Sequence, residues 1–192
     1  MAITRIITPS ITDDAVNASK FDETDNYSFT GTVSGAGGGI FESQLLHVQD
    51  QKSLSTDGGT STAGFQTRDL NTVVTNEITG ASLSSNQITL PAGTYYCIAS
   101  STAIKATNNQ LFVRNITDSN ATLLVGRSDC IGTSDIDGNS TFVNGRFTIS
   151  AQKVIDIYHF TNLGLATTGL GRQQPFGSDY NVYTDVQIWK VA

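Results

Sequence analysis

A succession of short segments with strand character runs from residue 41 to the C-terminus, and turn residues separate them. No ten-residue stretch among them shows the apolar spacing of an amphipathic helix. Pro91-Ala92-Gly93 is one clear turn, because proline presets φ and glycine accepts a positive φ. The pattern predicts an all-β sandwich or barrel of nine or ten antiparallel strands, over Phe41–Val48, Gly64–Leu70, Val73–Ile78, Ile88–Leu90, Thr94–Lys105, Leu111–Asn115, Thr122–Val125, Thr141–Ser150, Val154–Phe160 and Val182–Val191.

The composition favours the same fold class. Charged residues make up 15% of the chain, against about 25% in typical soluble proteins, and threonine, serine, asparagine and glycine take their place. These residues disfavour helices and suit strands joined by turns. The net charge of −6 offers no basic surface to a phosphate backbone, so we expect no nucleic-acid binding. The apolar runs fall far short of the roughly 20 residues that span a bilayer, so we expect no membrane insertion.

Residues 1–40 differ from the rest and are predicted to form a short, extended N-terminal segment. Thr4–Phe21 contains an Asp13-Asp14 pair that could cap one short helix, but it has too few apolar residues to fold without a partner chain. The glycine-rich stretch Gly35–Gly39 marks the boundary, so residues 41–192 are predicted to form the second domain. Residues 1–8 lack the apolar region of a signal peptide, so we expect synthesis in a cytoplasm.

Apolar side chains alternate on both faces of the later predicted strands. In Val154–Phe160, Ile155, Ile157 and His159 point one way, and Val154, Asp156, Tyr158 and Phe160 point the other. Strands that are apolar on both faces need cover on both, as in a sandwich that also packs against a neighbouring subunit. We therefore predict a subunit interface that includes Tyr158, Phe160, Tyr183 and Trp189.

Four stretches resemble one known family: LLHVQD at Leu45–Asp50, GGT at Gly58–Thr60, FQTRDLN at Phe65–Asn71 and ITLPAGTY at Ile88–Tyr95. They look like the C-terminal knob of bacteriophage and prophage fibre proteins, which is similar to the trimeric jelly roll of tumour necrosis factor and of complement and collagen heads. The resemblance covers residues 41–192. It implies a jelly-roll β-sandwich knob that assembles as a homotrimer, with YTDVQIWKV at Tyr183–Val191 as its last central strand.

The segment DDAVNASK at Asp13–Lys20 resembles the stretches that precede such knobs and attach them to the virion. The resemblance implies a structural protein on the virion surface, docked on the major capsid protein or on a tail or adaptor protein. The docking residues would be Ile6, Ile7, Ile11 and Val16. The stretch is short and without repeats, which leaves two placements open: a capsid decoration protein or head spike, and a host-attachment fibre.

The sequence provides few groups for catalysis, so we expect no enzyme. His47 and His159 lie on predicted strands whose neighbours suit packing better than chemistry. Cys97, in a strand, suits a small buried apolar residue, and we expect Cys97 and Cys130 to be free thiols, although one disulfide between them is arithmetically possible. Glycan depolymerase activity is a remote alternative, because such tailspikes are usually much longer β-helices.

Two loops carry the remaining hypotheses. Asp129, Asp135, Asp137 and Asn139 offer the oxygen ligands that calcium prefers, and Asp135 and Asp137 would be the metal ligands; no other cofactor is expected. The loop Gly164–Asp179 and the residue after it combine aromatic, amide and guanidinium groups suited to a host surface glycan. A secreted, lectin-like trimeric head is the alternative to a virion protein. The predicted contact residues are Arg172, Gln173, Phe176 and Tyr180.

Overall fold

A computed structural model describes residues 44–175 and 179–191. The chain divides into two units, Met1–Gly37 and Gly38–Ala192, and every described residue belongs to the second. Within the described ranges the elements are all strands: β1 Gln44–Ser53, β2 Gly64–Thr67, β3 Thr72–Asn76, β4 Ser82–Ser84, β5 Gln87–Leu90, β6 Gly93–Ile104, β7 Asn108–Asn115, β8 Ala121–Val125, β9 Asp129–Cys130, β10 Gly138–Ile149, β11 Lys153–Thr161 and β12 Tyr180–Lys190. None of these residues belongs to a helix that could cross a membrane.

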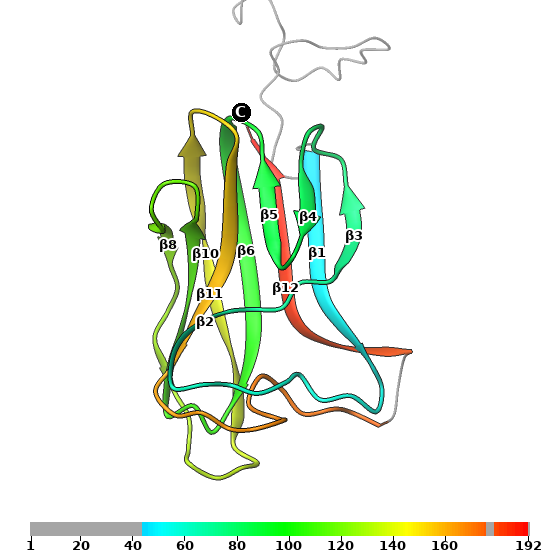
Figure 1. The fold of residues 1–192 in the computed structure, drawn as a ribbon, viewed down its shortest axis with the longest axis vertical. Coiled ribbons are helices and arrows are strands. Elements are labelled where there is room, and N and C mark those ends of the chain that lie inside the picture. The colour runs from blue at the N-terminus through cyan, green and yellow to red at the C-terminus, as the bar shows by residue number, and fades with distance from the viewer. Residues whose placement is uncertain (1–43, 176–178, 192) are drawn as a thin grey trace, which may run out of the picture. The chain divides into compact units, whose positions relative to one another are not determined.

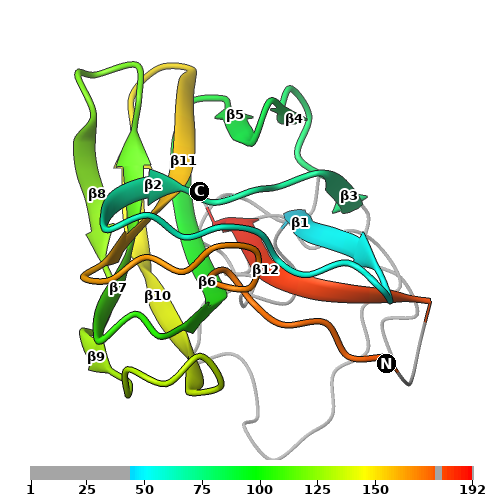
Figure 2. The same ribbon diagram turned by 60° about the horizontal axis from the view of Figure 1, so that its bottom comes forward.

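The strands form two sheets, and all their pairings are antiparallel. One sheet has five strands in the order β10-β6-β12-β1-β3. The other has seven: the order β4-β5-β11-β7-β8, with β2 added on β11 and β9 on β7. Figure 1 shows β1 beside β12, the first and last strands. The connections before β2, before β10 and after β11 gather at one end of the sandwich, and Figure 2 brings that end forward.

The core lies between the two sheets because alternate side chains of each strand point inward. In β6, Tyr95, Cys97 and Ala99 are fully buried, and Ile155 and Ile157 of β11, in the other sheet, belong to the same core. Burying one such aliphatic side chain stabilises the fold by about 1.5–3 kcal/mol. The remaining residues of this core are Leu46, Val48, Leu70, Ile78, Ile88, Leu90, Leu111, Val113, Val143, Phe147, Ile149, Val186 and Ile188.

Arg68, directly after β2, is a fully buried cation that joins both sheets. Its guanidinium donates to the carbonyl oxygens of Thr102, Leu170 and Tyr183 at 3.0–3.2 Å, and its Nε donates to Thr184 Oγ1 at 3.0 Å. Burial lowers the pKa of Arg68 to about 10, while Asp50 and Asp69 raise it, so the group stays charged at neutral pH. These bonds connect β6, β12 and the connection after β11 to one side chain.

The residues beside Arg68 in the TRDLN stretch each have a partner of their own. Thr67 Oγ1 donates to Asp156 Oδ2 at 2.7 Å, and Asn71 Nδ2 donates to Asp50 Oδ1 at 3.0 Å. Asn86 accepts from the Leu70 N–H at 3.1 Å from a two-residue hairpin turn between β4 and β5. Ser85 and Asn86 have φ of 50° and 66° there, as a type I′ turn requires. The TRDLN stretch is therefore hydrogen-bonded to β11, to β1 and to the β4–β5 turn.

The predicted all-β jelly-roll sandwich is confirmed. Two very short strands, β4 and β9, were not predicted, since three and two residues carry little periodicity. The boundary near residue 40 stays a prediction. The docking residues Ile6, Ile7, Ile11 and Val16 lie outside the described residues.

We expect Arg68→Ala to lower the free energy of unfolding by about 3 kcal/mol or more, because it leaves buried carbonyl oxygens without donors at about 1–3 kcal/mol each. Urea unfolding of wild type and variant at equal protein concentration measures this. Arg172→Ala, which truncates an exposed arginine, is the control and should shift stability by less than about 0.5 kcal/mol. A loss of under about 1 kcal/mol for Arg68→Ala would contradict the structural role.

Candidate functional site

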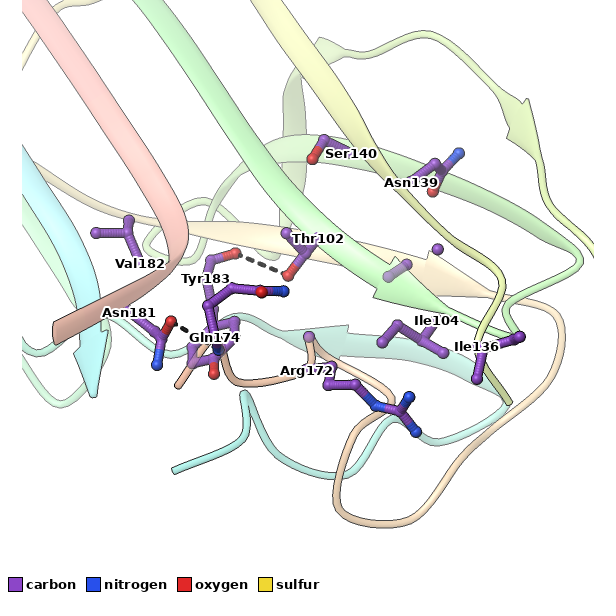
Figure 3. Close-up of a pocket in the computed structure, with 13 residues that line it drawn as sticks. Thr102, Ile104, Ile136, Asn139, Ser140, Arg172, Gln174, Asn181, Val182 and Tyr183 are labelled. Carbon is purple, nitrogen blue, oxygen red and sulfur yellow. Dashed lines mark hydrogen bonds between the residues drawn. The ribbon is translucent and has the colours of Figure 1, made fainter. Parts of the chain in front are cut away.

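A depression of about 460 Å³ lies on the outer side of the five-stranded sheet, at the end where the connections gather (Figure 3). It is built from the last residues of β6, the first residues of β10 and β12, and the connections around residues 136 and 172. Its volume falls in the range of about 300–1,000 Å³ of small-molecule sites. The lining consists of Thr102, Ala103, Ile104, Ile136, Gly138, Asn139, Ser140, Gly171, Arg172, Gln174, Asn181, Val182 and Tyr183.

The chemistry of this lining suits binding. Arg172 is exposed and brings a positive charge to a surround of hydroxyl and amide groups. Thr102 Oγ1 donates to the Leu170 carbonyl oxygen at 2.6 Å, and Asn181 Oδ1 accepts from the Gln174 N–H at 3.1 Å, so both side chains are fixed. Burial, then Asp57 and Asp50, raises the pKa of the Tyr183 phenol to about 12. The depression therefore offers a cationic anchor with fixed polar groups.

The structure places the predicted contact residues in different surroundings. Arg172 lines the depression, whereas Gln173 is half-buried and its N–H donates to Asp57 Oδ1 at 2.9 Å. Tyr180 is exposed at the start of β12, and Phe176 lies outside the described residues. Thr102, Asn139 and Asn181 were not predicted as contact residues, although Asn139 falls inside the predicted calcium loop. Glycan contact at this end of the molecule stays a prediction.

The carboxylates of the predicted calcium loop interact with the protein itself. Asp135 pairs with Lys105 Nζ at 2.7 Å, and Asp137 Oδ2 accepts the Ser134 N–H at 3.3 Å. Asp129 Oδ2 accepts from Asn139 Nδ2. In the part of the chain that the structure describes, no group of three or more His, Cys, Asp or Glu could hold a metal. A calcium site at Asp135 and Asp137 stays a prediction.

The predicted subunit-interface residues do not form one surface. Trp189 is on the outer face of the five-stranded sheet, while Tyr158 and Phe160 are on the outer face of the seven-stranded sheet. Phe65 of β2 covers both, stacked on Tyr158 at 5.1 Å between ring centroids and tilted against Phe160 at 5.0 Å. Tyr183 is only 3% exposed and donates its hydroxyl to the Thr56 carbonyl oxygen at 2.7 Å, so the chain itself buries this side chain.

The register of β1 and β12 explains why the Tyr183 side chain is buried. The pairing shifts between Asp50 and Gln51, opposite Thr184 and Val182, so Tyr183 is the extra residue of a β-bulge. A bulge breaks the two-residue period, and alternation counted from Trp189 therefore gives the wrong face for Tyr183.

The outer face of the five-stranded sheet keeps large apolar side chains in contact with solvent. Ile98 of β6 is 39% exposed and Phe142 of β10 is 42% exposed. They are diagonal neighbours, because Ser100 pairs with Phe142 and Ile98 with Asn144. Tyr96 and Trp189 lie in the next row, 6.3 Å apart. This surface, defined by Tyr96, Ile98, Phe142 and Trp189, is called the β6–β10 face below.

A polar network borders the β6–β10 face. Asp185 Oδ1 contacts His47 Nε2 at 2.7 Å and accepts from Gln49 Nε2, while Gln51 Nε2 donates to Gln49 Oε1 at 2.7 Å. These side chains are held in one arrangement without a partner chain.

The alternation within Thr94–Lys105 was the signal in the sequence that could have revealed the β6–β10 face, because buried Tyr95, Cys97 and Ala99 imply outward Tyr96 and Ile98.

The two cysteines have unlike surroundings. Cys97 is fully buried in the core, as predicted, and burial raises the pKa of its thiol to about 12. Cys130 is exposed on β9, and both are free thiols. Cys97 therefore serves packing.

His159 is fully buried and is not among the residues that line the depression. Its Nε2 lies 3.4 Å from Asn109 Oδ1, and its Nδ1 makes no hydrogen bond with the described residues. Burial, and to a smaller extent the charge of Arg68, lowers the pKa of His159 from 6.5 to about 3. The imidazole is therefore neutral across the physiological range and acts as a packing group.

This shift makes stability depend on pH. Between pH 6.5 and 3 the unfolded chain binds a proton at residue 159 that the folded chain does not, so wild type loses stability as pH falls through this window. We expect His159→Gln to lose less, with a difference in slope of up to about 1.4 kcal/mol per pH unit. Urea unfolding from pH 7 to pH 4 measures both slopes, and identical slopes would contradict the prediction.

The fold matches that of several solved structures. The chain superposes on murine APRIL at pH 8.5 with a TM-score of 0.51 and 14% identity, over 78% of this chain and 99% of the other. The globular domain of zebrafish complement 1qA protein gives 0.51 and 11%, over 78% and 98%. Eiger TNF from S. frugiperda gives 0.51 and 12%, over 79% and 94%. At these identities the likeness establishes a shared fold.

No protein-family model and no curated protein matches the sequence. The predicted similarity to the jelly roll of tumour necrosis factor and complement heads is confirmed at the level of the fold. None of these three structures is a bacteriophage protein.

Proposed function

We propose that this chain is the head of a homotrimeric binding protein, in which the β6–β10 face forms the subunit contacts. The observation that carries the proposal is the pair Ile98 and Phe142, two large apolar side chains left about two-fifths exposed as neighbours on long, regular strands. Covering them removes apolar surface from water. The jelly roll shared with APRIL, complement 1qA and Eiger TNF supports this role, as does the trimer that the sequence resemblance implies.

The depression lined by Arg172 is the proposed contact site of this head. Thr102 and Ser140 line it and pair across β6 and β10, two residues from Ser100 and Phe142. The depression therefore adjoins the proposed subunit contact, and a ligand bound there would lie beside the neighbouring subunit. Its lining suits recognition of polar groups by Arg172 and fixed amides, so the function is binding rather than catalysis.

We further propose that the head is displayed on a bacteriophage virion, with residues 1–40 docked on a capsid or tail protein. The support is the sequence resemblance of TRDLN, LPAGTY and DDAVNASK, together with a glycine-rich stretch between the two predicted parts. A secreted, lectin-like trimeric head is the second candidate, favoured by the fold that the chain shares with complement 1qA. Immunogold labelling of intact particles tests the virion placement, and particles without label would leave the secreted head.

Light scattering of the purified chain tests the trimer, and we expect a mass three times that of the chain. Phe142→Glu places a charge on the β6–β10 face, and we expect it to yield monomers. Val125→Glu is the matched control, because Val125 is 60% exposed on the seven-stranded sheet and should leave the trimer intact. A wild-type chain that stays monomeric at every concentration, or a Phe142→Glu trimer, would contradict the proposal.

A further inference from the structure

A second depression, of about 450 Å³, lies on the seven-stranded sheet. Residues of β7, the β8–β9 connection, β9 and β11 line it: Asn108, Asn109, Gln110, Ser128, Asp129, Cys130 and Phe160. None of them belongs to the β6–β10 face or to the depression around Arg172. One subunit supplies all of these residues.

Packed aromatic side chains form the apolar wall of this depression. Phe160 pairs with Gln110 on one side and with Phe65 on the other. Phe65 is 53% exposed and continues the ring surface beyond Phe160. Its stacking on Tyr158, with 8° between the ring planes, fixes it in place. Such a wall offers a rigid apolar surface to one face of a flat ligand.

The polar side chains that line the depression are also held in place by hydrogen bonds. Asn109 is 1% exposed, and its amide spans Asn139 Oδ1 and His159. Gln110 Nε2 donates to the Gly126 carbonyl oxygen at 2.7 Å, which sets the plane of its amide. Asp129 accepts from the Cys130 N–H and from Asn139 Nδ2. A carboxylate accepts about four hydrogen bonds, so Asp129 keeps capacity for a ligand.

From this arrangement we infer that the depression binds a neutral or N-acetylated saccharide. A pyranose ring has an apolar C–H face and a rim of hydroxyl groups, and this site sets an aromatic wall beside planar amide and carboxylate groups. The wall would take the C–H face, while Gln110 and Asp129 would hold neighbouring hydroxyls.

The charge of the site decides against acidic saccharides. Asp129 is the one charged residue in this lining, and it would repel a carboxylate or sulfate group. The net charge of −6 of the whole chain acts in the same direction. This proposal is independent of the trimer, because the complete site belongs to one subunit.

The full chain is tested first on an array of neutral, N-acetylated and acidic oligosaccharides, and the best neutral or N-acetylated ligand is then titrated by calorimetry. Phe160→Leu removes the ring while keeping an apolar side chain, and Gln110→Ala truncates an amide that would hold a hydroxyl group. We expect each to weaken binding about tenfold, the effect of losing one good contact. Asn144→Ala, an exposed asparagine on the other sheet, is the matched control and should bind as wild type.

Cys130 provides an independent readout, since it lines the site and is exposed. Bound saccharide should slow alkylation of Cys130 by iodoacetamide, whereas buried Cys97 stays unmodified in the folded protein. Protection in wild type that is lost in Phe160→Leu supports the site. No binding of any neutral or N-acetylated saccharide, a preference for acidic ones, or affinity unchanged in both variants would overturn it, whatever the outcome of the trimer test.

Discussion

The buried guanidinium of Arg68 is the interaction on which the rest of the structure depends. A cation without contact with water needs an acceptor for each donor, and here the acceptors come from β6, β12 and the connection after β11. Thr102 and Tyr183 supply two of those carbonyl oxygens and also line the Arg172 depression. The hydrogen bonds that offset the cost of burying Arg68 therefore also fix Thr102 and Tyr183, two residues that line the candidate contact site.

The two outer faces of the sandwich differ in how the chain covers its own apolar residues. On the seven-stranded sheet, Phe65 packs over Tyr158 and Phe160, and Arg114 lies 3.5 Å above the Tyr158 ring while paired with buried Asp156. On the five-stranded sheet, Ile98 and Phe142 stay 39% and 42% exposed among the described residues, although Arg127 lies 6.0 Å from the centre of the Phe142 ring. The seven-stranded sheet therefore presents a packed aromatic surface that suits a ligand. The five-stranded sheet presents exposed apolar side chains that suit contact with another subunit.

Alternation along the strands predicted the fold class and placed Ile155 and Ile157 on one face of their strand, which the structure shows to be the buried one. Long-range features could not be predicted in this way. Arg68 finds its acceptors 34 to 116 positions away, and nothing near it in the sequence marks an arginine as buried. The bulge at Tyr183 likewise depends on pairing with β1, which local alternation does not contain. Arg172, a predicted glycan-contact residue, lines the depression, whereas the strand residues beside it carried no signal in the sequence.

Tyr158 and Phe160 show what an apolar strand face does and does not imply. Apolar residues on both faces of a strand require cover, but the sequence does not say whether a neighbouring subunit or the chain itself provides it. Four residues of β2 suffice to cover β11 here, because β2 adds to the sheet beside it and brings Phe65 over the rings. An oligomer should be inferred from the apolar side chains that stay exposed after the chain's own packing has been taken into account. Ile98 and Phe142 stay exposed on the five-stranded sheet, and Phe65 stays 53% exposed on the seven-stranded sheet. We propose the first pair for the subunit contact, because they are neighbours on long paired strands, and the ring surface of Phe65 and Phe160 for recognition of a ligand.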